Sequence, residues 1–359
     1  MTPHLEKRLE NDLNEIRSRI ADQGRLAEEA VTKAVNALQT GNRQLAYDTV
    51  MNDHPINRNM RYIDRLCHKF IALHLPSAGH LRLLSSAIRV NIELERVGDY
   101  AVTIAREAAQ LSAPPSGTIA RELERLAGET MLILKQAIKS FNELNLETAR
   151  STVLLTGQME HNLDMIYEEM MSESQHQQMK DLLAVFVVFT QLKRVADQAK
   201  NLCEETIFAV SGDQKPPKVY DVLFVDEQNN LYSKLAEAVA RINFPGSGRY
   251  RSAGKTPAAQ VDEKLWSFLQ SRGLDAVETG TTAVANLTPH EVAEQTIIIS
   301  LQVPIDDYFP SIPFHTSALQ WDVVPAEGVE SPEDMDALYR DLALRVRQLM
   351  ELLRGEEAS

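Results

Sequence analysis

Apolar residues recur at spacings of three and four from residue 3 to about residue 210, and Pro and Gly lie mainly between these segments. This period is typical of amphipathic helices. It predicts helices at 4–39, 42–74, 77–112, 115–144, 146–175 and 177–210. After the break SGDQKPPK at 211–218, short apolar runs alternate with helical stretches and turns, which predicts an α/β domain.

The helical part of the sequence repeats itself. Residues 48–69 align with 151–172, and residues 82–108 align with 180–206 at a slightly smaller offset. Each copy contains three of the predicted helices, so we expect two tandem three-helix bundles followed by a small α/β domain with a parallel sheet. The expected boundaries are 1–112 and 113–211 for the two bundles, 212–218 for a linker and 219–359 for the α/β domain.

The third helix of each copy carries two apolar stripes, and we expect both stripes to be buried. In the first copy one stripe contains Leu83, Val90 and Val97, and the other contains Leu81, Leu84, Ile88 and Ile92. In the second copy Phe186 belongs to the second stripe. That stripe continues in the first copy into Glu95 and Asp99, two carboxylates one turn apart on one face, where the second copy has Lys193 and Asp197.

Carboxylates at i and i+4 supply hard oxygen ligands for a divalent cation or an iron cluster. Glu95, Asp99 and Asp197 are therefore candidate metal ligands, with the identity of the metal left open, and a solvated acidic face is the alternative. Lys193 offers no lone pair while protonated and repels a cation, so we expect the second site to be weakened or lost. Lys193 could instead form an ion pair with Asp197 or Glu160.

The charge and cysteine content limit the functional classes. A net charge of −14 opposes binding to a phosphate backbone, so we expect no nucleic-acid partner. The chain has no apolar run long enough for a transmembrane span and its first residues are charged, so we expect neither a span nor a signal peptide. Cys67 and Cys203 are too few for a disulfide framework, and a reducing cytoplasm is expected.

Two segments resemble a known family. ELERVGDYAVTIAREA at 93–108 and KRVADQAKNLCEETIF at 193–208 are similar to the two signature helices of PhoU proteins, and NDHPINRNMRYIDRLC at 52–67 resembles the helix before the first signature. The resemblance covers about residues 3–210. It implies metal ions or small clusters bound by an E/D-x-x-x-D motif, which Glu95 and Asp99 match in full and Asp197 matches in part.

Members of this family are cytoplasmic accessory proteins that restrain the phosphate-starvation response by contacting a phosphate ABC transporter and a membrane sensor kinase. The resemblance therefore implies a non-enzymatic regulator with these partners, located in the cytoplasm or peripherally at the inner membrane through them. It allows a homodimer. The alternatives are a metal-binding sensor or store, and an enzyme that uses the C-terminal domain.

Residues 219–354 resemble low-molecular-weight tyrosine phosphatases and the related arsenate reductases. The matching segments are the strand VLFV at 222–225, RYRSAGKTP at 249–257, VDEKLWSFLQSRGLD and TIIISLQ. That family uses a thiolate nucleophile in a C-x5-R-S loop, whose arginine and backbone N–H groups hold the phosphoryl group.

In this chain the catalytic pair of that loop is replaced. Asp226 stands where the family has cysteine and Tyr232 where it has arginine, with Asn229 and Ser233 completing the degenerate loop. Asp226 and Glu227 would repel phosphate, so we expect an inactive pseudophosphatase domain. Two alternatives for Asp226 are an aspartyl-phosphate nucleophile and a simple cap on the following helix.

Overall fold

The computed structural model describes residues 3–74, 76–156, 179–272, 280–313, 316–323 and 328–359. The chain divides into two compact units, Met1–Lys215 and Pro216–Ser359, and this boundary falls within the expected linker. In the described part of the chain, no helix combines the length and the apolar character needed to cross a membrane.

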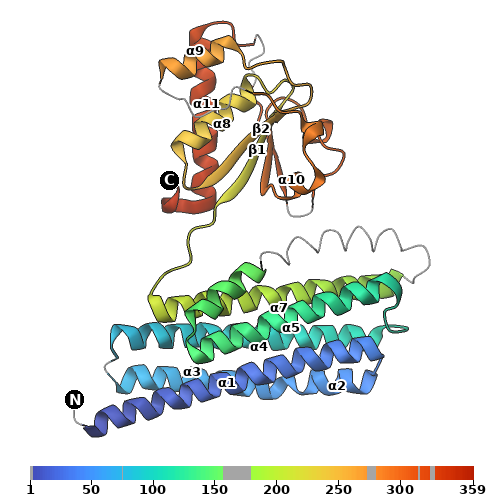
Figure 1. Ribbon diagram of the computed structural model, residues 1–359, viewed down its shortest axis with the longest axis vertical. Helices are drawn as coiled ribbons and strands as arrows, with labels where there is room; N and C mark the ends of the chain where they lie inside the picture. The colour runs from blue at the N-terminus through green and yellow to red at the C-terminus, as the bar shows by residue number, and fades with distance from the viewer. Residues whose placement is uncertain (1–2, 75, 157–178, 273–279, 314–315, 324–327) are drawn as a thin grey trace. The chain divides into compact units, whose positions relative to one another are not determined.

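Every described element of the first unit is a helix (Figure 1). Its elements are α1 (Pro3–Thr40), α2 (Arg43–Met51), α3 (Asp53–Leu73), α4 (Ala78–Gln110), α5 (Gly117–Glu143), a helical stretch at 146–156, and α7 (Met179–Ser211). Asn42 and Ser77 cap the N-termini of α2 and α4 by accepting backbone N–H groups of Leu45 and His80. The rest of the helix expected at 146–175 lies outside the described residues.

One predicted helix is two helices. Residues 42–74 form α2 and α3, which meet at Asn52. Pro55 follows three residues later and has no N–H to donate to the carbonyl of Met51, so a continuous helix would be broken here. The first turn of a new helix tolerates proline, because its N–H groups have no partner within the helix.

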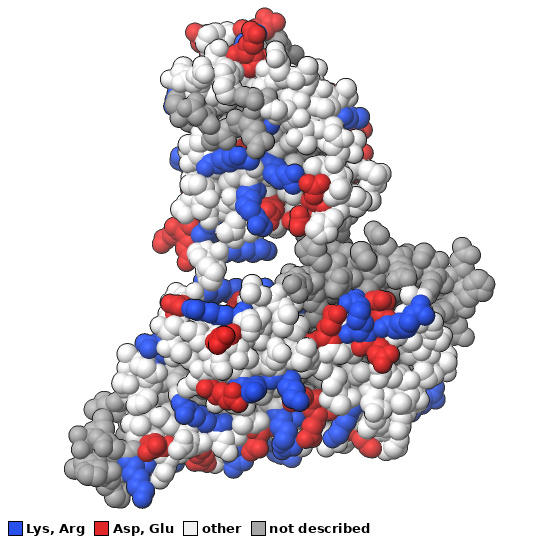
Figure 2. Space-filling view, in the orientation of Figure 1, with Lys and Arg blue, Asp and Glu red and all other residues white. Residues whose placement is uncertain are grey.

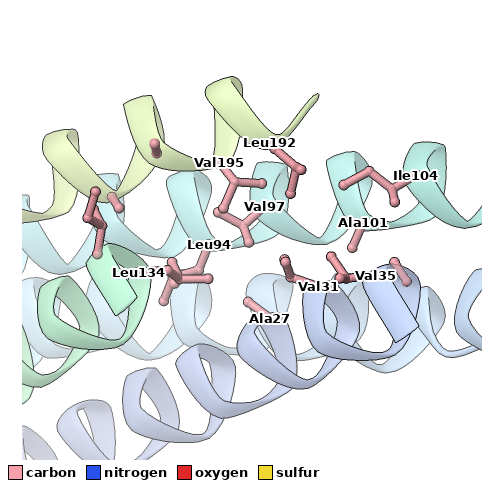
Figure 3. Close-up of a cluster of buried hydrophobic side chains, with 14 of the residues drawn as sticks. Ala27, Val31, Val35, Leu94, Val97, Ala101, Ile104, Leu134, Leu192 and Val195 are labelled. Carbon is pink, nitrogen blue, oxygen red and sulfur yellow. The ribbon is translucent and has the colours of Figure 1, made fainter. Parts of the chain in front are cut away.

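The two helical copies share one hydrophobic core. The first apolar stripe of α4 is buried as expected, and so is the corresponding stripe of α7. Figure 3 shows where side chains from both copies meet: Ala27, Val31 and Val35 of α1, Leu94, Val97, Ala101 and Ile104 of α4, Leu134 of α5, and Leu192 and Val195 of α7. The repeats are therefore one packed unit and not two separate cores.

The expected burial of the second stripe is wrong in part. Leu84 is buried, but Leu81 is 45% exposed, Ile92 38% and Phe186 43%. The second buried face of α4 is formed instead by small and polar residues, among them Asn91 and Gly98. Small side chains let a neighbouring helix approach closely, whereas the sequence pattern weighs only apolar character.

The second unit is the expected α/β domain with a parallel sheet. The strands are β1 (Tyr220–Asp226), β2 (Gly248–Gly254), β3 (Ile297–Ser300) and β4 (Ser317–Gln320), all parallel and in the order β2-β1-β3-β4. The helices are α8 (Tyr232–Asn243), α9 (Glu263–Ser271), α10 (Pro289–Ala293) and α11 (Pro332–Arg354), with short 3₁₀ turns at Val284–Asn286, Ile305–Asp307 and Gly355–Glu357.

Both faces of this sheet are covered. Val222 and Phe224 of β1 pack in one cluster with side chains of α8, α9 and α11, while Leu223 and Val225 pack on the other face near α10 (Figure 1). Burial on both sides explains why β1 is a continuous apolar run and not an alternating one. Asp226 ends this strand, at the edge of the sheet where open α/β folds bind ligands.

Candidate functional site

The carboxylate pair Glu95 and Asp99 lies on α4, where α3 packs closely against it. A Cβ added at Gly98 would lie 3.0 Å from Cδ1 of Ile56 and 3.5 Å from Oδ1 of Asp53. Glycine at this position therefore lets the start of α3 approach α4. Farther along the same contact, Asn91 donates its side-chain N–H to the carbonyl of Met60 at 2.8 Å and fixes the two helices to each other.

Three carboxylates repel one another at this contact. The pKa of Glu95 is raised by burial, by Asp99 and by Asp53, and the nearby Arg96 lowers it only in part. The pKa of Asp99 is raised by burial and then by Asp53. The ionised forms are therefore held at a cost that a bound cation would reduce.

Asp53 was not among the expected ligands. Its Oδ1 is buried without a hydrogen-bond partner among the described residues, while its other oxygen accepts a hydrogen bond from the Asn57 side chain. A buried, unpartnered carboxylate oxygen is rare and fits the environment of a cation. The sequence did carry a signal: Asp53 and Asn57 have the same i, i+4 spacing as Glu95 and Asp99, and both lie in the family-like segment 52–67.

The arrangement is not a complete metal cage. Among the described side chains, no group of three or more His, Cys, Asp or Glu is placed to hold one metal ion. An ion held by Glu95 and Asp99 would therefore keep water in its remaining coordination positions. Asp197 and Lys193 are half-buried on α7 in the second copy and do not join Glu95 and Asp99 in one group; Glu160 lies outside the described residues.

The second candidate region is the loop between β1 and α8. Asp226 is only 1% exposed. Its Oδ1 accepts the backbone N–H of Asn229, and its Oδ2 accepts the backbone N–H of Ser233 at 2.9 Å. Because Ser233 is in the first turn of α8, the carboxylate caps this helix from the end of the central strand.

Asn229 holds the middle of the loop. It has a positive φ of 48°, its side-chain N–H donates to Oγ of Ser233 at 2.9 Å, and its Oδ1 accepts the N–H of Thr282 at 2.7 Å. Gly254 at the end of β2 lies directly against it, since an added Cβ would be 2.6 Å from the Asn229 nitrogen. The structure thus brings Asp226, Asn229 and Ser233 together.

The electrostatics of this loop are acidic. Burial raises the pKa of Asp226, although the surrounding N–H groups oppose that shift. Burial and the Asp226 carboxylate raise the pKa of Tyr232, and burial with Asp226 and Glu227 raises that of Tyr308. Among the described residues no ion pair reaches Asp226, and the buried Lys234 lies 3.8 Å from Glu237 instead.

Neither cysteine can act at this loop. Cys67 and Cys203 are both buried in the first unit. Burial raises the pKa of each thiol to about 12, so both stay protonated near neutral pH.

Comparison with known proteins places the helical unit in a family. The PhoU domain model matches residues 20–108 and 123–206. A phosphate-specific transport system accessory protein PhoU homolog of Pseudomonas putida is 30% identical over 221 residues, which cover 59% of this chain and 84% of that protein. The crystal structure of PhoU from Pseudomonas aeruginosa has 29% identity and a TM-score of 0.53, covering 57% of this chain and 99% of that one.

The chain is also similar to the solved structure of an arsenate reductase. The crystal structure of an arsenate reductase from Archaeoglobus fulgidus has 22% identity and a TM-score of 0.30, and it covers 36% of this chain and 97% of that chain. The strand order and the helices of the second unit define its fold independently of this alignment. The family expected for residues 3–210 is confirmed.

Proposed function

The chain belongs to the PhoU family, and from this premise we propose that it regulates phosphate uptake and the phosphate-starvation response by protein contact. The proposed partners are a phosphate ABC transporter ATPase and a membrane sensor kinase. Both contacts are assigned to the first unit, because the family match lies entirely within it. The chain would act in the cytoplasm, reaching the inner membrane through its partners.

One observation carries this proposal. Two copies of the family domain occur in order at 20–108 and 123–206, and α4 and α7, which contain the two signatures, lie side by side in one core. On the face of the helical unit shown in Figure 2, Lys and Arg side chains alternate with Asp and Glu. No basic patch for nucleic acid gathers on that face.

The partner contacts can be tested by cross-linking and purification from phosphate-rich cells. We expect the transporter ATPase or the sensor kinase to co-purify with the chain. The cross-linking is controlled by a preparation in which the transporter retains one of its own subunits. If that control succeeds and both proposed partners are reproducibly absent, the proposal is wrong.

We further propose that the second unit has no phosphatase activity. The support is chemical: Asp226 replaces the thiol nucleophile, and both of its oxygens already accept N–H groups inside the fold. Tyr232 replaces the arginine and brings no positive charge to the loop. An aspartyl-phosphate mechanism would require an exposed Asp226 and a cation beside it.

Hydrolysis of an aryl phosphate tests whether the second unit has phosphatase activity. We expect no hydrolysis above the buffer rate for the full chain. Measurable hydrolysis that Asp226→Asn abolishes would establish an enzyme instead.

We also propose a metal ion at the α3–α4 contact, held by Glu95 and Asp99. Its positive charge would offset the repulsion between these two carboxylates and Asp53. The supporting observation is the buried, unpartnered oxygen of Asp53. Bound metal would supply positive charge that fixes this end of α3 against α4. Asp197 is the corresponding candidate in the second copy, weakened by Lys193.

Elemental analysis of the purified chain tests the metal. We expect metal in the wild type and loss of most of it in the variant carrying Glu95→Ala and Asp99→Ala. The matched control is Asp197→Ala, which should retain the metal of the first copy. Equal metal content in all three proteins would remove the metal proposal while leaving the regulator standing.

A further inference from the structure

The backbone of the loop after β1 has its two kinds of polar group turned in opposite directions. Four of its carbonyls accept N–H groups from the segment that follows β2. The bonds run from Lys255 to Asp226 at 3.1 Å, Thr256 to Glu227 at 2.8 Å, Ala258 to Gln228 at 2.8 Å and Asp262 to Asn230 at 3.1 Å. In two of these peptides the N–H opposite the outward carbonyl, that of Gln228 or of Asn229, points to the inside of the loop and acts on the Asp226 carboxyl group. The N–H of Ser233 joins them there, whereas the N–H of Glu227 donates to Gln302. Successive N–H groups that converge in this way form an anion-binding concavity.

A carboxylate already fills this concavity. The N–H groups of Asn229 and Ser233 donate to different oxygens of Asp226, and the N–H of Gln228 also acts on this carboxyl group. Asp226 is in addition the residue from which the loop starts, so its side chain folds back into the loop. The N-terminus of α8 and the loop thus have their negative charge supplied from within the chain.

The neighbouring structure fixes this closed form. Gly254 leaves no room for a side chain beside the Asn229 backbone, and the N–H of Thr282 donates to the Asn229 side chain. Glu227, by contrast, is exposed, and its N–H donates to Oε1 of Gln302 at 2.7 Å. One carboxylate is therefore built into the loop while its neighbour remains at the surface.

We propose that the loop 226–233 is an oxyanion cradle whose permanent occupant is the side chain of Asp226. The carboxylate keeps the loop folded without any ligand and excludes free phosphate from it. The second unit therefore does not sense phosphate through this loop. This inference concerns the second unit alone and does not depend on the role proposed for the first.

The test is to remove the occupant and offer a substitute. Asp226→Ala leaves the N–H groups without an acceptor, and Glu227→Ala is the matched control because it removes an adjacent carboxylate that faces solvent. Unfolding of the second unit is followed by tryptophan fluorescence in the full chain, with inorganic phosphate compared against sodium chloride of equal ionic strength. Both tryptophans, Trp266 and Trp321, are in this unit.

Phosphate should raise the unfolding temperature of Asp226→Ala by about 4 °C at ten times its dissociation constant. The wild type and Glu227→Ala should not respond. The same response in all three proteins, or no response in a folded Asp226→Ala variant, would overturn the proposal.

A measurement on the wild type covers the case in which Asp226→Ala does not fold. The backbone amide resonances of Asn229 and Ser233 should shift as Asp226 titrates and remain unchanged when phosphate is added. Amide shifts that saturate with phosphate would show that the cradle is open, contrary to the proposal.

Discussion

At the scale of single residues, burial and two neighbouring carboxylates act together on Glu95. Its pKa is raised by burial, by Asp99 and by Asp53. Glu95 and Asp99 could be predicted from the sequence, because both lie on one helix and their phase follows from its apolar period. Asp53 was missed because its approach depends on the packing of α3 at Gly98, which is a tertiary contact and leaves no periodic signal.

Neutralising this carboxylate should stabilise the metal-free protein. We expect Glu95→Gln to raise the unfolding temperature of the first unit by about 1 °C at about pH 7, because partly exposed charges interact weakly. A raised pKa means that ionisation of Glu95 disfavours the folded state. The wild type therefore loses stability as the pH rises through the raised pKa of Glu95, and Glu95→Gln does not. The gain of Glu95→Gln should therefore shrink as the pH falls toward about 4.

Circular dichroism melts across this pH range check the sign. Glu124→Gln is the control, because Glu124 is an exposed carboxylate on α5. A gain for Glu95→Gln that is the same at both pH values, or that Glu124→Gln reproduces, would contradict the assignment of repulsion to this cluster.

Gly254 of the second unit has no space for a side chain. An added Cβ would lie 2.6 Å from the Asn229 nitrogen and 2.8 Å from the Gln228 carbonyl carbon, both of which are backbone atoms that cannot rotate away. Gly254→Ala should therefore destabilise this unit by about 2 kcal/mol. Urea unfolding followed by tryptophan fluorescence measures the change, and Gly280→Ala, which has open space around the added atom, should cost far less.

At the scale of elements, packing between helices decided what the sequence pattern could not. The first apolar stripe of α4 and the strand β1 were predicted correctly, because each is a regular apolar run buried where its period places it. In the second predicted stripe Leu84 is buried, whereas Leu81 and Ile92 are exposed. The second buried face of α4 contains small residues such as Gly98, which let a neighbouring helix approach. A search for hydrophobic periodicity does not detect such residues.

Substitutions at two glycines in helix interiors distinguish the effect of packing from the effect of helix propensity. At Gly24 of α1 an added Cβ would lie 2.6 Å from Cγ2 of Ile138 on α5, whereas Gly128 of α5 has nothing within 4 Å. Gly128→Ala should stabilise the first unit by about 1 kcal/mol through propensity alone. Gly24→Ala gains the same propensity, but it overpacks a branched side chain and should be destabilising by about 1 kcal/mol net.

Equilibrium urea unfolding followed by circular dichroism measures both variants. Stabilisation by both substitutions would show that α1 and α5 are not in close contact at Gly24. Destabilisation by both would show that helix propensity does not decide the effect of the substitution at Gly128.

At the scale of the whole molecule, the chain is two units with separate hydrophobic cores. One cluster unites both helical copies, and two other clusters lie on the two faces of the sheet. The sequence located the boundary between the units because SGDQKPPK interrupts the helical period. That the two helical copies share a single core was not predicted, since a repeat specifies equivalent helices and not how the copies pack together.

Separate cores should give separate unfolding transitions. We expect Gly254→Ala to lower the urea midpoint of the fluorescence transition, which reports on Trp266 and Trp321. The main far-ultraviolet circular dichroism transition, to which the helical unit contributes most, should not move. Gly24→Ala should have the opposite effect. A shift of both transitions by either substitution would show that the units fold as one cooperative structure.

The proposed role is restraint of the phosphate-starvation response by protein contact, without chemistry in the second unit. The test deletes the gene in the organism that carries it and measures a starvation-responsive promoter in phosphate-rich medium. Either the full wild-type chain or Asp226→Asn, which keeps an acceptor oxygen for the loop, is then restored. We expect deletion to activate the promoter and both proteins to return it to the repressed level. A promoter that stays repressed after deletion, or that only the protein with an intact Asp226 can repress, would contradict the proposed role.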